Sequence, residues 1–352
     1  MSKNTAYHDI KDQQNIEKIR ELERMLPDYV KGYIRSIAPS TTSRTRLCYA
    51  YDLRIFFQFL KDQNPELAHS PLHAITLEQI SMLTPADLDE YMEYLRLYRN
   101  EENKVITNKD TAIKQKMSAV RGLFRYLYKR GHIPGNPTEL IRMPKVRDKA
   151  IIKLDPNESA MLLDYIEKRG EKLSGRQLTK YNKEKARDYA IITTLLGTGI
   201  RVSECVGLDV TDIDFNNNSL KVFRKGGKEA FVFFGDEVAE ALEDYLVERE
   251  GIHPLPGHEN ALFYSDRNTR ITERTVERLV KSYGSAIAPN KKVSPHTLRR
   301  TFGTNLYEDS SDIYLVADAL GHNDINTTKK HYAALDTTRK KLTIRKLRIR
   351  QE

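Results

Sequence analysis

The sequence predicts a mainly α-helical fold with a small antiparallel β-sheet, divided into two domains. Three features support this prediction: helical spacing of apolar residues in the first part, a proline-containing break near residues 143–154, and short β-type segments in the second part. A chain of 352 residues is long enough for two domains that each bury a core of their own.

The first part of the chain has the pattern of a helical bundle. Apolar residues recur at helical spacing from Ile16 to Ile133, most clearly in YAYDLRIFFQFL, ADLDEYMEYLRLY and TAIKQKMSAVRGLFRYLYKRG. No internal repeat of fixed period is present, which argues against a solenoid or a propeller. We therefore expect a helical domain over residues 1–142.

The next segment, GNPTELIRMPKVRDKAIIKLDP, has three prolines and no sustained period, so residues 143–154 are expected to form a linker. A helix is expected to begin at Asp155, because this residue can cap free amides, Pro156 suits the first turn and Glu158 completes a capping pattern. The second domain is therefore placed at residues 155–352.

The second domain is expected to mix helices with a minor sheet. After the helical segment EKARDYAIITTLLGTG, short β-type segments are separated by the turn sequences NNNS and KGG. Helical spacing resumes at Asp236 and is predicted to continue to the end of the chain.

The charge and composition of the chain indicate which kind of partner it binds and in which cellular compartment it works. The net charge of +9 favours a polyanion, with nucleic acid ahead of an anionic membrane surface. No apolar run approaches the roughly 18 residues of a membrane span. The N-terminal segment MSKNTAYHDIKDQQ lacks the apolar core of a secretion signal, and Cys48 and Cys205 lie far apart and have no C-x-x-C partner. These features predict a cytoplasmic protein whose cysteines are small core residues.

Four separated segments contain side chains suited to phosphate chemistry. They are TGIRVSE with Arg201, FRKGGKEA with Lys225, SPHTLRRTF with His296 and Arg299, and LGHNDINTTKKHYAAL with His322 and Tyr332. Each has an ordinary explanation when taken alone: Arg201 can pair with Glu204, Lys225 can be an exposed hairpin lysine, His322 can end a helix, and Tyr332 can be a core residue. Ser294 and Pro295 resemble a helix start, which would place His296 and Arg299 on one face of its first turn.

Together these groups suit transesterification of a phosphodiester. Two arginines can hold both non-bridging oxygens of a phosphate, and a lysine can protonate the departing 5′ oxygen. A tyrosine can serve as the nucleophile, although half-ionising a phenol near pH 7 requires about 4 kcal/mol of stabilisation from adjacent cations and a base. We expect His296 to be that base or a proton relay.

In the order Arg, Lys, His-x-x-Arg, His, Tyr, the chain resembles the tyrosine recombinases, particularly the bacterial Xer proteins, over nearly its whole length. The resemblance implies an N-terminal domain that binds DNA at the core site and a C-terminal catalytic domain. It also implies a role for each residue: Arg201 and Arg299 clamp the scissile phosphate, Lys225 is the general acid, His296 assists proton transfer, His322 hydrogen-bonds the phosphate, and Tyr332 attacks. Two positions depart from the family pattern: His322 and Tyr332 are ten positions apart, one more than usual, and Arg300 replaces a second histidine.

The N-terminal stretch LERMLPDYVKGYIRSIAPSTTSRTRLCYAYDLRIFFQFL resembles that of the XerS branch, which is said to act without a second, different recombinase. This similarity suggests chromosome-dimer resolution, with integration or excision of a mobile element as the alternative. A type IB topoisomerase, which uses the same chemistry on one duplex, and a DNA-binding regulator without chemistry are the other candidates.

Further basic residues are candidates for DNA contact and assembly. Lys114, Arg121 and Arg125 are spaced by seven and four, which lines them along one side of a helix, where they either follow a phosphate backbone or form a solvated face. The family resemblance implies that the tail TTRKKLTIRKLRIRQE docks into a neighbouring subunit, giving a homotetramer on two DNA duplexes; the tail can instead lie on DNA or on its own domain. No metal-binding motif or P-loop is present, so we expect activity without metal, ATP or another cofactor.

Overall fold

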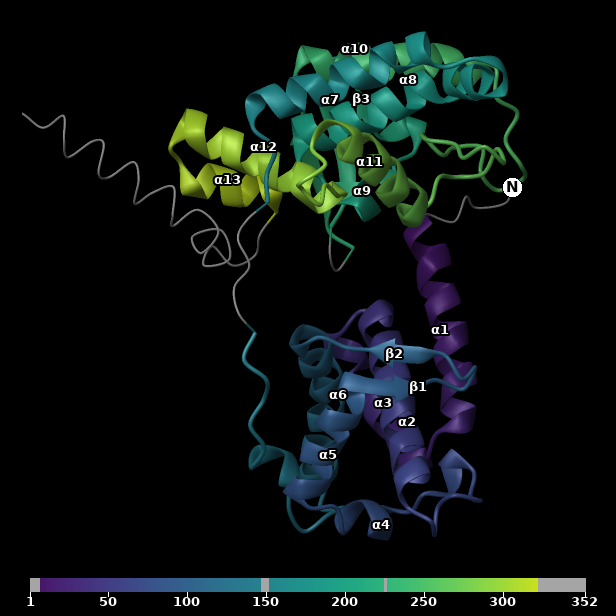
Figure 1. Cartoon of the computed structure of the whole chain (residues 1–352), viewed down its shortest axis with the longest axis vertical. Helices are drawn as coiled ribbons and strands as arrows, with labels where there is room; N and C mark the ends of the chain where they lie inside the picture. The colour runs from purple at the N-terminus through teal and green to yellow at the C-terminus, as the bar shows by residue number, and fades with distance from the viewer. Residues whose placement is uncertain (1–6, 147–151, 225–226, 322–352) are drawn as a thin grey trace, which may run out of the picture. The chain divides into compact units, whose positions relative to one another are not determined.

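The computed structural model describes residues 7–146, 152–224 and 227–321. Its internal contacts divide the chain into two compact units, residues 1–149 and 150–352 (Figure 1). Each unit has its own secondary structure and is described separately below.

The first unit is built mainly from α-helices around one apolar core. Its elements are α1 (Tyr7–Met25), α2 (Asp28–Ser36), η1 (Ala38–Ser40), α3 (Ser43–Gln63), η2 (Leu72–Ala74), α4 (Leu77–Ser81), α5 (Pro85–Arg96), β1 (Leu97–Arg99), β2 (Val105–Thr107), α6 (Asp110–Lys129) and η3 (Pro137–Glu139). Phe56, Phe57, Tyr91 and Phe124 are fully buried, and Phe56 contacts the other three rings edge-on at 5.0–6.2 Å between centroids. The expected helical bundle is present.

A short antiparallel hairpin interrupts the helical pattern of this unit, so the prediction of helix throughout residues 16–133 is wrong at one place. Strands β1 and β2 pair Tyr98 with Ile106. In both strands an exposed, half-buried, exposed order replaces the helical period, and Asn103 at the turn has a left-handed φ of 57°. Three-residue strands are too short for their alternation to stand out from the flanking helices.

Helices α2 and α6 approach closely because each contributes a glycine opposite a tyrosine of the other. A Cβ on Gly122 would lie 2.0 Å from the Tyr33 hydroxyl, and a Cβ on Gly32 would lie 2.9 Å from the Tyr126 hydroxyl. The rings of Tyr33 and Tyr126 pack together at 5.8 Å. This contact fixes α6, the helix that carries Lys114, Arg121 and Arg125.

The second unit places helices around a three-stranded sheet. Its elements are α7 (Pro156–Lys168), η4 (Arg169–Lys172), α8 (Gly175–Thr198), α9 (Val202–Gly207), η5 (Val210–Asp212), β3 (Ile213–Asp214), β4 (Ser219–Phe223), β5 (Glu229–Phe233), α10 (Asp236–Glu250), α11 (Glu273–Ile287), α12 (Pro295–Ser310) and α13 (Ile313–Leu320). The sheet order is β3-β4-β5 and both pairings are antiparallel. The predicted fold class, helices with small antiparallel sheets, is confirmed.

Local sequence signals place several boundaries of this unit correctly. Asp155 caps α7 through a reciprocal pair of hydrogen bonds with Glu158, and Pro156 occupies its first turn. Ser294 caps α12, with Pro295 as its first residue. Helix α10 begins at Asp236, as expected. Helix does not continue from there without a break, because residues 252–272 form an irregular segment in which Pro254 and Pro256 cannot donate to a helical ladder.

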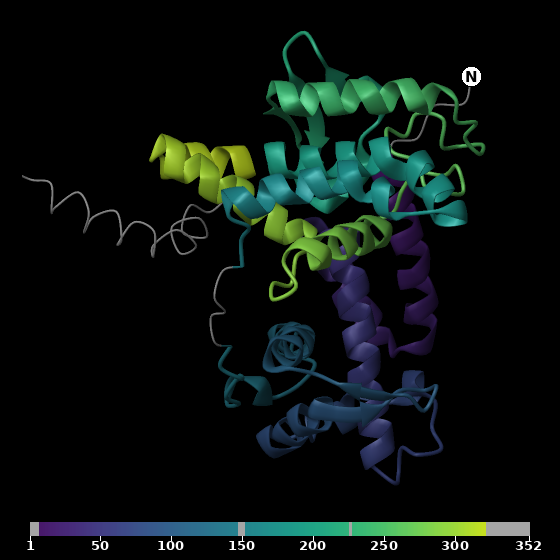
Figure 2. The ribbon, with the colours of Figure 1, turned by 45° about the horizontal axis from the view of Figure 1, so that its top comes forward.

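Helix α8 is the centre of this unit, since it packs against α7, α10 and α12. Its C-terminal half is buried through Ala190, Ile191, Ile192 and Leu195, and it ends at Gly199 with a left-handed φ of 62°. Helices α12 and α13 lie side by side in both views (Figures 1 and 2). Their contact is a small buried cluster of Tyr307, Val316 and Leu320.

No helix in the described ranges is both long and apolar enough to cross a membrane. Both cysteines are free thiols. Cys205 is buried, and this burial raises the pKa of its thiol to about 12, whereas Cys48 is only half-buried. Cys205 therefore fits the predicted core role better than Cys48 does.

Candidate active site

Arg201 stands at the start of α9. The Glu204 carboxylate accepts a hydrogen bond from the Arg201 backbone N–H at 2.7 Å and pairs with Arg201 Nη1 at 2.7 Å. The ion pair with Glu204, which is the ordinary explanation for an arginine at position 201, is thus present. It is also an anchor, because Glu204 is 4% exposed while the Arg201 side chain is 39% exposed. The buried carboxylate holds a partly exposed cation in one orientation.

Arg299 lies one turn into α12 and is almost fully buried. Its Nη1 donates to the carbonyl of Gly199 at 2.5 Å, and its Nη2 donates to the carbonyl of Leu320. The left-handed Gly199 ends α8 and Leu320 ends α13, so one guanidinium joins the C-terminal ends of two helices. His296, three residues earlier in the first turn of the same helix, is exposed.

The C-terminal end of α13 brings distant arginines together. Arg201 Nη2 donates to the carbonyl of Gly321 at 3.4 Å, beside the bond from Arg299 to Leu320. A third arginine, Arg224, donates from Nη1 to the carbonyl of Asp318 at 3.2 Å and from Nη2 to that of Ala319 at 3.1 Å. The last carbonyls of a helix lack partners within it and have partial negative charge, so cations are stabilised there.

Arg224 was not selected by sequence reasoning, although it directly precedes Lys225 in FRKGGKEA. Its only sequence signal is that position beside a candidate residue, since its partners lie 94 and 95 residues away. Gly321 was likewise not selected. Its left-handed φ of 60° ends α13, and a Cβ there would lie 2.4 Å from the Arg224 guanidinium.

Three candidate residues, Lys225, His322 and Tyr332, lie outside the described residues, as does the tail TTRKKLTIRKLRIRQE. The described residues directly before two of them belong to the arginine cluster: Arg224 precedes Lys225, and Gly321 precedes His322. The structure therefore brings together Arg201 and Arg299, and it places Arg224 and Gly321 with them.

Comparison with known proteins identifies the family of this chain. The sequence profile of the Phage integrase family matches residues 153–339, more than half of the chain. The tyrosine recombinase XerS of Streptococcus mutans is 31% identical, and the match covers 89% of this chain and 93% of that protein. The tyrosine recombinase XerC of Pelobacter propionicus is 32% identical over 86% of this chain and 87% of that protein. This chain belongs to the phage integrase family, the tyrosine recombinases.

Solved structures of other tyrosine recombinases have the same fold. A post-cleavage complex of XerH with its palindromic difH substrate aligns with a TM-score of 0.65, at 20% identity, over 95% of this chain and 89% of that one. The Tn1549 transposon integrase in complex with circular intermediate DNA aligns with a TM-score of 0.63, at 21% identity, over 90% of this chain and 99% of that one. The predicted enzyme class, a site-specific DNA recombinase of the Xer type, is confirmed.

In the first unit of this recombinase, the three basic residues proposed to contact DNA lie on α6. Lys114 and Arg125 are exposed and Arg121 is half-buried. None of the three forms an ion pair within the described part of the chain, whereas Lys116 on another side of α6 is bound to the buried Asp52 at 2.9 Å. Their charges are therefore not neutralised by neighbouring carboxylates of that region.

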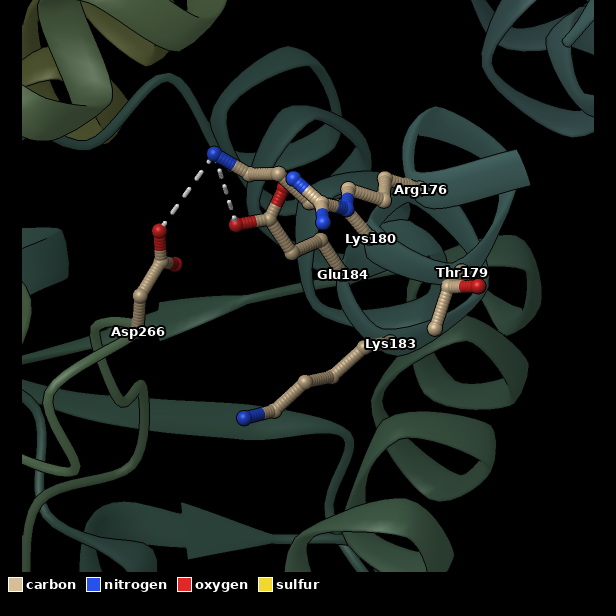
Figure 3. A pocket seen from close by; sticks show the side chains of 6 residues that line it. All are labelled: Arg176, Thr179, Lys180, Lys183, Glu184 and Asp266. Carbon is tan, nitrogen blue, oxygen red and sulfur yellow. Dashed lines mark ion pairs between the residues drawn. The ribbon is translucent and has the colours of Figure 1, made fainter. Parts of the chain in front are cut away.

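A shallow pocket of the second unit lies at the other end of α8. Arg176, Lys180 and Lys183 line it with Glu184 and Asp266, and Lys180 bridges the two carboxylates at 3.7 and 3.5 Å (Figure 3). From Lys180 to Gly199 the helix rises about 28 Å at 1.5 Å per residue. This pocket is therefore separate from the arginine cluster at the end of α13.

The pocket adjoins a buried charge network that holds α8 against its neighbours. Arg187 binds Asp188 through Nε and Nη2 at 3.0 and 2.8 Å, and Tyr283 of α11 donates to the same carboxylate at 3.0 Å. Arg187 also donates to the carbonyl of Tyr264 at 3.2 Å. These bonds hold α8 against α11 and against the segment that contains Tyr264. Among the described residues, no cluster of histidine, cysteine and carboxylate side chains could hold a metal ion.

Proposed function

We propose that this recombinase cleaves and rejoins DNA through a 3′-phosphotyrosine bond to Tyr332, in a site made by Arg201, Lys225, His296, Arg299 and His322. The supporting observation is that Arg201 and Arg299 hydrogen-bond the consecutive carbonyls of Gly321 and Leu320. Two cations from α9 and α12 thus meet beside the residue that precedes His322.

The chemistry follows from the charges of the reacting groups. Arg201 and Arg299 hold the non-bridging oxygens and offset the charge that grows in the pentacoordinate transition state. The Tyr332 oxygen forms a bond to phosphorus and gives up its proton with the help of His296, while the bond from phosphorus to the 5′ oxygen breaks and Lys225 supplies the proton to that oxygen. His322 donates a hydrogen bond to the phosphate. Attack by the 5′ hydroxyl of a partner strand then reverses these steps and restores the phosphodiester.

The substrate is double-stranded DNA at a specific recombination site, bound by a homotetramer that holds two duplexes. Lys114, Arg121 and Arg125 contact the phosphate backbone, and the C-terminal tail docks into a neighbouring subunit. The biological role is chromosome-dimer resolution, which the names of the XerS and XerC relatives support. Integration or excision of a mobile element is the second candidate, favoured by the fold similarity to the transposon integrase.

Covalent trapping tests the chemistry. A nicked duplex that loses its short cleaved fragment cannot be rejoined, so the enzyme should accumulate as an adduct that resists SDS. Tyr332→Phe should abolish the adduct and keep DNA binding. Tyr314→Phe is a matched control, because Tyr314 is 68% exposed on α13, and it should form the adduct at the wild-type rate. An adduct in Tyr332→Phe, or none in the wild type, would contradict the proposal.

Two further experiments test the remaining parts. Cleavage should persist in EDTA and without ATP, because the phosphotyrosine conserves the energy of the broken strand; loss of cleavage on chelation argues against this chemistry. A protein truncated after Thr338 should still bind DNA as a single protomer, but it should no longer recombine two duplexes. Undiminished recombination by the truncated protein would eliminate the docking role of the tail.

A further inference from the structure

Arg224 is held at both its backbone and its side chain. Its backbone N–H donates to the carbonyl of Lys228 at 2.8 Å, and its own carbonyl accepts from Gly227 at 3.1 Å. The first bond extends the β4–β5 ladder by one residue beyond the last strand pair, Phe223 with Glu229, and the second joins two residues that are three apart. The backbone of Arg224 therefore closes the base of the hairpin loop.

The side chain of Arg224 crosses to a different element. Its two terminal nitrogens bind the carbonyls of Asp318 and Ala319, and a Cβ on Gly321 would displace the guanidinium from this position. The neighbouring carbonyls of Leu320 and Gly321 accept from Arg299 and Arg201. Four consecutive carbonyls at one helix end are thus bound by three arginines from the hairpin, α9 and α12.

We propose that Arg224 is a positioning residue that fastens the hairpin carrying Lys225 to the C-terminal end of α13, in one frame with Arg201 and Arg299. The inference rests on the proposed function, because it matters only if Lys225 delivers the proton to the leaving oxygen. Consecutive Cα atoms are about 3.8 Å apart, so an anchor at residue 224 limits where residue 225 can reach.

The chemistry of the side chain explains why an arginine suits this position. Its planar fork binds two adjacent carbonyls at once, whereas a lysine ammonium is a point charge without that fixed geometry. The partial negative charge of the helix end adds to the attraction. Since an error of about 1 Å in the position of a catalytic group can cost about 100-fold in rate, loosening the hairpin should slow proton transfer.

The test separates proton delivery from general damage by changing the leaving group. In DNA with sulfur in place of the bridging 5′ oxygen, the departing thiolate is a much weaker base and leaves without a proton. We expect Arg224→Ala to slow cleavage of ordinary DNA by about 10- to 100-fold and Arg224→Lys by a smaller factor. With the sulfur substrate, both variants should cleave within about threefold of wild type, as should Lys225→Ala, since no acid is then needed.

Control variants distinguish a loss of positioning from a loss of DNA binding or of folding. Arg274→Ala removes an exposed arginine of α11 and should cleave both substrates at the wild-type rate. Arg224→Lys keeps the charge and should bind DNA like wild type. Thermal unfolding of each variant checks that the second unit stays folded at the assay temperature.

The outcomes are distinct. If Lys225→Ala recovers on the sulfur substrate while Arg224→Ala remains slow, the positioning role is refuted and the proposed function stands. If Arg224→Ala loses DNA binding in proportion to cleavage, Arg224 is a DNA contact and the inference fails. If Lys225→Ala itself does not recover, the acid role in the proposed function fails, and this inference fails with it.

Discussion

Replacement of Arg299 should loosen helix α13 as well as reduce activity. Its guanidinium binds the carbonyls that end α8 and α13, and it is almost fully buried. A hydrogen bond to a charged group contributes about 1.5–3 kcal/mol. Arg299→Ala removes both bonds and should therefore cost about 3–6 kcal/mol, whereas Arg299→Lys keeps one and should cost about half as much.

This loss should be confined largely to α13, because the helix has eight residues and the buried cluster that it forms with α12 is small. Local opening of α13 should then require less free energy than unfolding of the whole unit. Native-state hydrogen exchange over residues 313–320 is the suitable assay. For Arg299→Lys, a loss of 1.5–3 kcal/mol corresponds to a fall in protection of about 10- to 150-fold.

The matched control is Arg278→Lys, an exposed arginine on α11 whose replacement should leave this exchange unchanged. Exchange of α13 within about twofold of wild type in both Arg299 variants would refute the reasoning. If the prediction is correct, the activity of Arg299→Ala reports two losses together.

Three further predictions concern other parts of the chain. Arg121→Ala should lower the salt slope of DNA binding by about 0.9 and weaken all sequences alike; an unchanged slope means no phosphate contact. Burial, followed by the hydrogen bond with Asp266, raises the pKa of Glu184 to about 7. Its contribution to stability is thus complete below pH 4.5 and is lost as the pH rises through 7. Urea unfolding should show that the free energy of unfolding falls by about 1–2 kcal/mol over this range, a value already reduced for the partial exposure of the group. Glu184→Gln should abolish this fall. A pH dependence equal to wild type would contradict this. Gly122→Val should destabilise the first unit by about 1–3 kcal/mol through its clash with Tyr33, while Gly135→Val, with open space around it, should change the urea midpoint little; equal midpoints would argue against the close contact.

Features governed by near neighbours could be predicted from the sequence. The starts of α7 and α12 depend on Asp155 with Glu158 and on Ser294 with Thr297, pairs only three residues apart. The turns around the β3-β4-β5 sheet likewise follow from asparagines and glycines that accept left-handed backbone, such as Asn218 and Gly227. The hairpin at residues 97–107 escaped prediction because its strands have three residues each, fewer than a period of two needs to become visible.

The partners of the site residues could not be predicted in the same way. The pair of Arg201 with Glu204 is local, but Arg201 meets Gly321 across 120 residues, and Arg299 meets Gly199 across 100. Nothing in the spacing of Arg224 distinguishes it from a surface arginine. Its bonds to the carbonyls of Asp318 and Ala319 form only in the folded structure, where α13 ends beside the hairpin.

The sequence by itself determined the kinds and the order of the reactive groups, the helical character of both parts and the family resemblance, because these depend on residue type and on neighbours along the chain. Only the tertiary structure decided that the carbonyls at the end of α13 gather Arg201, Arg224 and Arg299. The physical reason is that a helix end leaves its carbonyls unpartnered, and folding determines which distant cations can reach them.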